Sequence, residues 1–188
     1  RVDTVLLPKD YLRLWLTGER VAEMSDAAGT SWLDTGARDW SDDLLARSGL
    51  GRAQMPRLVE GSQVSGTLRP ALARRWGMGD AVPVAGGAGD NAASAIGMGV
   101  VRAGQGFVSL GTSGVLFVAN DGYRPAPETA VHTFCHALPG TWHQMGVILA
   151  ATDALNWFAG LVGADAAELT GGLWSLQAPG QTLFLPYL

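Results

Sequence analysis

The sequence has 188 residues with a net charge of −4, and 47% of them are hydrophobic while 16% are charged. This composition predicts a packed globular core of one domain or parts of two. The sequence contains no cluster of basic residues, so we expect no nucleic-acid partner. No apolar stretch approaches the roughly 18 residues of a membrane span, and the first residues do not resemble a signal peptide, so we expect no membrane partner. The single cysteine, Cys135, excludes an internal disulfide, favours a cytoplasmic location and is expected to be a buried thiol.

The first part of the chain predicts short helices separated by turns. Helices are expected over residues 8–18, 41–49 and 70–77, because each stretch begins with Pro or Ser and ends with Gly. The segment 25–40 is rich in turn-forming residues and contains one short apolar element at 32–33. The abundance of glycine, 26 residues in all, fits an α/β protein with many tight turns.

The middle of the chain predicts a strand, a loop and a helix in succession. Residues 82–85 are expected to form a short buried strand, 86–89 a glycine loop and 90–98 a helix of small residues. Between about 100 and 105 the pattern changes to that of a β-meander. We therefore expect a domain boundary there, with one domain over 1–101 and another over 102–188.

The last part of the chain predicts two hairpins followed by helices. The first hairpin is expected over 106–120, and the second over 131–150 with Pro139 and Gly140 at its turn. An apolar helix at about 152–162, an amphipathic segment near 164–170 and a final strand in TLFLPYL should follow. Because the chain starts on Arg1 and stops within an apolar run, we expect it to be a piece of a longer protein.

The glycine loop followed by Asp90 is the first candidate site. Glycines allow close approach of the backbone to a ligand, and a helix N-terminus favours the ionised form of a carboxylate. Such a carboxylate can accept the proton of a substrate hydroxyl during phosphoryl transfer. The alternative is that Asp90 only caps the helix.

The turn in SLGTSG, residues 109–114, is the second candidate site. Backbone N–H groups of a Gly/Thr/Ser turn can hold phosphate oxygens, although an ordinary hairpin turn is the alternative. The turn is not a serine-hydrolase elbow, because Gly114 directly follows Ser113. It is not a Walker A loop either, because Lys9 is the only lysine of the sequence.

Taken together, the two candidate sites resemble the FGGY family of carbohydrate kinases. GGAGDNAASAIGMG resembles the end of the first domain of that family, and GFVSLGTSGVLFVAN resembles the start of the second. HTFCHALPGTWHQMGV is most similar to the members that phosphorylate xylulose, and SDAAGTSWLDTGARDW to the loop before their sugar site. The resemblance covers essentially the whole chain. One segment, ILAATDALNWF, departs from the more glycine-rich start that the family usually has for this helix.

The resemblance implies a partial α/β, ribonuclease H-like (actin-like ATPase) fold that spans the end of the first, sugar-binding domain and the start of the second, nucleotide-binding domain. It implies ATP-dependent phosphorylation of a ketopentose, D-xylulose above all, in the intact protein. Asp90 matches the general base, Asn91 a neighbouring sugar-site position, and Gly111 and Thr112 the turn that contacts the phosphates of ATP. Mg²⁺ would be the metal cofactor, the sugar and ATP the small-molecule partners, and a homodimer would be compatible with the family.

Several alternatives stay open at this point. The sugar could be ribulose, gluconate or glycerol, or the chain could be a non-catalytic sugar-binding or filament module with an actin-like core. The carboxylate of Asp90 favours an enzyme, because a sensor needs no base there. The family's early Asp-Gly-Thr phosphate loop has no counterpart in the sequence, so we expect the chain alone to be inactive.

The three histidines could suggest a metal site, but the sequence offers them too few further ligands. If Pro139 and Gly140 centre the turn, His136 and His143 lie opposite each other on the two strands. Two imidazoles without a third ligand do not make a zinc site, so we expect structural roles and no metal ligands. Trp32, near the sugar-site segment, is a candidate wall of that site.

Overall fold

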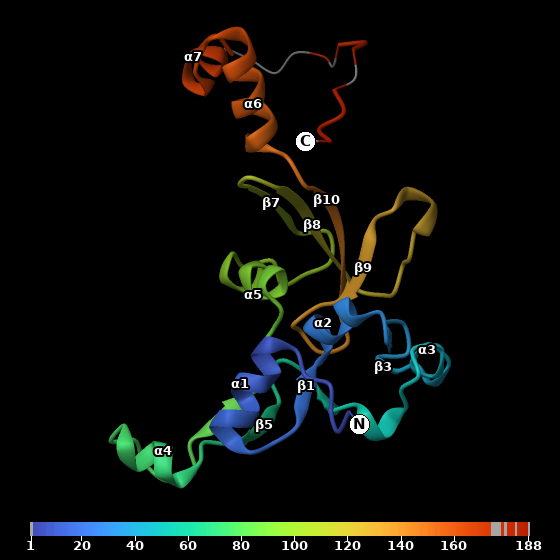
Figure 1. Cartoon of the computed structure of the whole chain (residues 1–188), viewed down its shortest axis with the longest axis vertical. Coiled ribbons are helices and arrows are strands. Elements are labelled where there is room, and N and C mark those ends of the chain that lie inside the picture. Colours follow the sequence, from blue (N-terminus) through green and yellow to red (C-terminus); the bar gives the residue numbers. More distant parts are fainter. Residues whose placement is uncertain (1, 174–177, 179, 183, 188) are drawn as a thin grey trace.

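The computed structural model describes residues 2–173, 178, 180–182 and 184–187. Figure 1 shows an elongated molecule in which the chain begins among the elements at one end and finishes beyond a sheet at the other. The helices are α1 (Pro8–Thr17), α2 (Met24–Ala27), α3 (Asp42–Arg47), α4 (Pro70–Arg75), α5 (Asp90–Gly97), α6 (Thr152–Val162) and α7 (Ala166–Gly171). No helix among these residues is long and apolar enough to cross a membrane.

Over the part of the chain that the structure describes, the strands form one four-stranded sheet and three pairs. The strands are β1 (Val21–Glu23), β2 (Leu33–Asp34), β3 (Asp39–Trp40), β4 (Arg57–Val59), β5 (Val64–Thr67), β6 (Pro83–Ala85), β7 (Gly106–Leu110), β8 (Gly114–Asn120), β9 (His132–Cys135) and β10 (Trp142–Ile148). The larger sheet is antiparallel with the order β7-β8-β10-β9, and β1 pairs with β4 in parallel. In Figure 1, α5 lies between this sheet and the N-terminal elements.

The predicted helices are confirmed, and local capping explains their ends. α1 begins at Pro8 and ends at Gly18, which adopts a left-handed φ of 89° and donates its N–H to the Leu14 carbonyl. The Ser41 hydroxyl accepts a hydrogen bond from the Leu44 N–H at the start of α3. These signals are readable from the sequence because each cap depends only on residues within one turn of the helix.

Both hairpins are confirmed, but the predicted register of the second is wrong by two residues. His143 pairs with Phe134 rather than with His136. The turn between β9 and β10 has four residues, 137–140, and is closed by a hydrogen bond from the His136 N–H to the Thr141 carbonyl. Gly140 occupies the last turn position with a φ of 63°, so the turn is centred one residue earlier than predicted.

Two other strand predictions also need correction. β6 exists, but Pro83 and Ala85 are exposed, because within the described residues β6 pairs with β5 alone and is not covered as a central strand would be. The final strand is absent from the described part of TLFLPYL, Thr182 and 184–187, while Leu183 and Leu188 lie outside the described residues.

Two hydrophobic clusters of buried residues form the core of the described part of the chain. The first gathers Ala22, Ala27, Ala28, Leu33, Trp40, Leu45 and Cys135, and the second gathers Ala95, Val100, Phe107, Phe117, Ala119 and Met145. Phe134 packs against both clusters. The Cys135 thiol is buried as predicted, and burial raises its pKa to about 11, so the thiol is protonated and unreactive at neutral pH.

Candidate active site

The glycine loop between β6 and α5 runs directly against neighbouring backbone. The N–H groups of Gly86 and Gly87 donate to the carbonyls of Gln63 and Gly61 at 2.8 and 2.9 Å. A Cβ atom on Gly86 would overlap the Glu60 carbonyl oxygen, and Gly87 has a φ of 78°. Both positions therefore require glycine, one for space and one for backbone conformation.

Asp90 is the first residue of α5 and presents an exposed carboxylate. Gly89 takes the cap position, and no side chain caps this helix. One carboxylate oxygen of Asp90 accepts hydrogen bonds from the backbone N–H of Asn91 at 2.7 Å and from its side-chain amide at 3.2 Å. Gly89 rather than Asp90 therefore takes the N-cap position, while one oxygen of Asp90 satisfies a first-turn N–H and its second oxygen can face a ligand.

A cavity of about 110 Å³ opens beside Asp90 and Asn91. Its walls come from α2, from the start of α5 and from strands β9 and β10. It is lined by Ser25, Asp26, Gly29, Gly89, Asp90, Asn91, Ala92, Phe134, His143 and Met145. The cavity thus combines carboxylates, an amide, a hydroxyl and an imidazole with apolar surface, a mixture suited to a small polyhydroxylated ligand.

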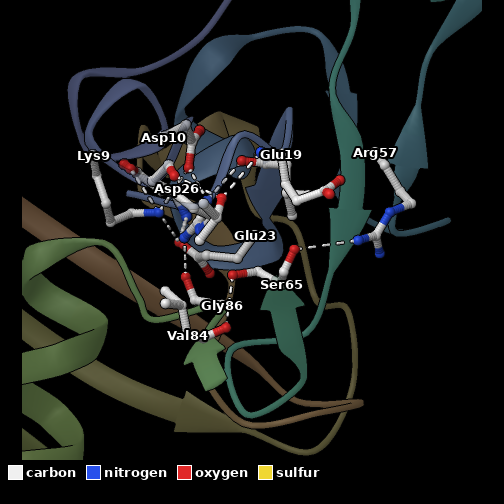
Figure 2. A network of polar contacts seen from close by, with 12 residues as sticks. Lys9, Asp10, Glu19, Glu23, Asp26, Arg57, Ser65, Val84 and Gly86 are labelled. Atoms are coloured by element: carbon white, nitrogen blue, oxygen red, sulfur yellow. Dashed lines mark hydrogen bonds and ion pairs between the residues drawn. The ribbon is translucent and has the colours of Figure 1, made fainter. Parts of the chain in front are cut away.

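A buried ionic network holds the glycine loop in place (Figure 2). Arg13, which is 4% exposed, donates to the Asp10 carboxylate at 2.6 Å, to the Val21 carbonyl at 2.6 Å and to the Gly86 carbonyl. The nearby Lys9 ammonium lies 3.1 Å from Asp10 and 3.3 Å from Glu23. One guanidinium therefore joins α1, β1 and the loop that carries Asp90.

A second chain of hydrogen bonds reaches the other end of the loop. The Glu23 carboxylate accepts from the N–H groups of Ser25 and Asp26 and from the Ser25 hydroxyl, all at 2.8 to 2.9 Å. The Ser25 hydroxyl oxygen in turn accepts from the Gly89 N–H at 2.9 Å. Burial is the main cause of a raised pKa for the Asp26 carboxyl. The Lys9 ammonium, 3.5 Å away, acts in the opposite direction and lowers that pKa.

The histidines occupy different environments. His136 is buried, with Nε2 3.2 Å from the Val100 carbonyl, and burial lowers its pKa. His143 is also buried, and burial, followed by the nearby His136, lowers its pKa to about 3. A contact with the backbone of Cys135 opposes that shift, but it lacks the geometry of a hydrogen bond, so neither ring nitrogen of His143 has a hydrogen-bond partner among the described residues. No cluster of three or more potential metal ligands occurs in the described part of the chain.

The Gly111–Thr112 turn lies apart from the cavity, since none of the lining residues belongs to it. Its carbonyls are tied to the start of α6: Thr112 accepts from the Ala151 N–H at 2.6 Å, and Gly111 accepts from the N–H and hydroxyl of Thr152. The Gly111 N–H donates to the Ser113 carbonyl at 2.9 Å, so this donor is already used inside the turn. Of the predicted site residues, Asp90 and Asn91 therefore line the cavity, whereas Gly111 and Thr112 lie outside it.

Three residues of the cavity wall, Ser25, Asp26 and His143, were not predicted from the sequence, and the predicted wall residue Trp32 lies elsewhere. Ser25 and Asp26 lie in the segment that resembles the family's sugar-site loop, but no local signal indicates that they reach Asp90. Trp32 of the same segment does not line the cavity, and its indole N–H donates to the Ser48 hydroxyl at 2.9 Å. His143 lines the cavity, whereas the sequence suggested only a structural role.

Comparison with known proteins defines the class. Residues 1–97 match the N-terminal domain of the FGGY family of carbohydrate kinases, and the chain belongs to this family. Along its whole length the chain is 53% identical to a xylulose kinase of Klebsiella pneumoniae and covers 39% of that protein.

Solved structures agree. The chain superposes on a "xyloylose kinase" from Brucella ovis with a TM-score of 0.92 and 65% identity, covering 100% of this chain and 39% of that one. For a xylulose kinase from Rhodospirillum rubrum the TM-score is 0.79 and the identity 29%, with 90% of this chain and 34% of that chain covered. The predicted partial α/β, actin-like fold is confirmed, and the chain spans about 39% of the length of the first relatives.

Proposed function

We propose that the full-length protein carrying this chain transfers the γ-phosphoryl group of ATP to a hydroxyl of a ketopentose, D-xylulose. The observation that carries the proposal is the exposed Asp90 carboxylate, placed at a helix N-terminus and at the edge of a polar cavity. The similarity to xylulose kinases over the whole chain supports the choice of sugar.

In the proposed reaction Asp90 accepts the proton of the attacking hydroxyl as the new O–P bond forms and the bond to ADP breaks. Asn91 fixes one carboxylate oxygen through its backbone and side-chain N–H groups, which leaves the other oxygen for the substrate. The hydrogen bonds of Arg13 and of Glu23 with Ser25 fix the two ends of the glycine loop, so the Asp90 carboxylate does not need to reorganise during the reaction.

The nucleotide side of the proposal depends on Gly111 and Thr112, as the resemblance implies. The attachment of their carbonyls to α6 supports a fixed turn that phosphate oxygens could approach. Mg²⁺ usually keeps several waters and is held by one or two carboxylates together with the substrate phosphates. Because one oxygen of Asp90 is held by Asn91 and the other is needed for the substrate hydroxyl, we assign no residue of this chain to the metal. When bound, Mg²⁺ would neutralise charge on the phosphates.

The division of the chain into a sugar-binding part, 1–101, and a nucleotide-binding part, 102–188, is also a proposal. It is supported by the change from paired short strands to the four-stranded sheet after α5. The cytoplasmic location and a homodimer belong to the same proposal, the first supported by the free, buried Cys135.

The proposal is tested by measuring ATP-dependent phosphorylation by the full-length protein with xylulose, ribulose, gluconate and glycerol. We expect the highest kcat/KM for xylulose and no turnover by the 188-residue chain alone. A preference for another sugar would correct the substrate, and the absence of turnover with all four sugars would contradict the proposed activity.

A further inference from the structure

His143 occupies the middle of β10 and is enclosed by aromatic rings. Its ring stacks on Phe117 with centroids 4.2 Å apart, and meets the edges of Phe134 and His136 at 6.0 and 5.9 Å. The residue is only 2% exposed. A phenylalanine would satisfy the same packing, so these contacts alone do not explain a polar ring.

The two nitrogens of His143 have no partner among the described residues, although a neutral imidazole carries one donor and one acceptor. Buried polar groups are almost always hydrogen-bonded, and each exception calls for an explanation. The neighbouring His136 follows the rule, with Nε2 near the Val100 carbonyl and Nδ1 accepting from the Leu138 N–H at 3.3 Å. The unpaired ring is therefore a specific property of position 143.

The position of the ring suggests its partner. His143 lines the cavity that also contains Asp26, Asp90 and Asn91, while His136 does not. Because burial keeps the His143 imidazole neutral at physiological pH, the ring suits an uncharged hydroxyl better than a phosphate anion.

We infer that His143 binds a hydroxyl of the sugar substrate, one other than the hydroxyl that Asp90 deprotonates, and so helps to determine which sugar is accepted. This inference rests on the proposed kinase function. It identifies β10, from the second part of the chain, as a contributor to the sugar site beside α2 and α5.

The test compares His143→Phe with the matched control His136→Phe in the full-length protein. We expect His143→Phe to raise the KM for xylulose by roughly twofold to tenfold, the range of one neutral hydrogen bond, and to leave the KM for ATP unchanged. His143→Gln, which retains a donor and an acceptor, should restore part of the affinity. His136→Phe should leave the KM for xylulose unchanged.

An unchanged KM for xylulose in His143→Phe would overturn the inference, and would indicate that the ring only packs. A wild-type protein without turnover on any sugar would instead contradict the proposed function, so the two failures are distinguishable. A measurement on the unmutated protein guards against misfolded variants. With ¹⁵N-labelled histidine, xylulose should shift the ring resonances of His143 and leave those of His136 in place; unshifted His143 resonances would also overturn the inference.

Discussion

Replacing Arg13 by Met tests how the buried ionic network supports the glycine loop. Met fills a similar volume but removes the guanidinium that pairs with the buried Asp10 carboxylate, and the carbonyls of Val21 and Gly86 lose this donor. Among the described residues, Lys9 then remains as the cation paired with the carboxylates of Asp10, Glu23 and Asp26.

The magnitude follows from burial. Arg13 and Asp10 are 4% and 0% exposed, so solvent cannot compensate for the loss of the guanidinium. Removal of one partner of such a pair typically costs about 3–5 kcal/mol. Lys9, at 3.1 Å from Asp10, should keep the loss near the lower limit, about 3 kcal/mol.

Urea unfolding of the full-length protein measures this effect through the shift of the midpoint at constant slope. The double variant Arg13→Met/Asp10→Leu should recover part of the loss, because no unpaired carboxylate remains. Asp43→Asn is the control, since its ion pair with Arg47 is exposed and contributes little. A loss below about 1 kcal/mol for Arg13→Met, the size expected of an exposed pair, would refute the reasoning.

Three further predictions concern the histidine, the loop and the turn. The folded-state pKa of His143, about 3, lies below its ordinary value of 6.5. Above pH 6.5 the imidazole is neutral in both states and stability does not depend on it, whereas below pH 6.5 the unfolded state binds a proton that the folded state does not, so the protein loses stability as the pH falls. Between pH 7.5 and pH 5, thermal or urea unfolding should therefore show wild type losing about 2 kcal/mol more than His143→Phe, and equal losses would contradict this sign. Gly86→Ala should destabilise the protein by more than about 1 kcal/mol in urea unfolding, because its Cβ would overlap the Glu60 carbonyl. The control Gly97→Ala in α5 meets no atom within 4 Å, so its stability should be unchanged or higher. Gly111→Val should raise the KM for ATP more than that for xylulose without unfolding the protein, since a Cβ there meets only the Ser113 carbonyl, at 3.8 Å; equal increases in both KM values would count against a phosphate-binding role.

Elements defined by local chemistry were predictable from the sequence. The Pro8 and Gly18 ends of α1, the Ser41 cap of α3 and the glycine loop before α5 each depend on residues close together in the chain. The position of Asp90 at the head of a helix followed from the same local pattern.

Features that depend on distant partners were not predictable. The burial of β6 depends on how many strands flank it, and the register of β9 and β10 depends on which residues of the two strands pair across the sheet. The cavity joins Asp26, Asp90 and His143, which are separated by more than fifty residues at each step and meet only in the folded chain. The unpaired state of His143 likewise depends on Phe117 and Phe134, which shield its ring from water.

The central claim is that Asp90 is the general base of a sugar kinase, and single-turnover phosphorylation of xylulose by Asp90→Asn in the full-length protein tests it most directly. Asn keeps the shape and can still accept from Asn91, and a substitution at this exposed position should leave the fold intact. We predict a fall in rate on the order of 10²–10⁴ with the urea midpoint and xylulose binding retained, while the exposed control Asp121→Asn keeps the wild-type rate. A rate for Asp90→Asn close to that of wild type would contradict the assignment.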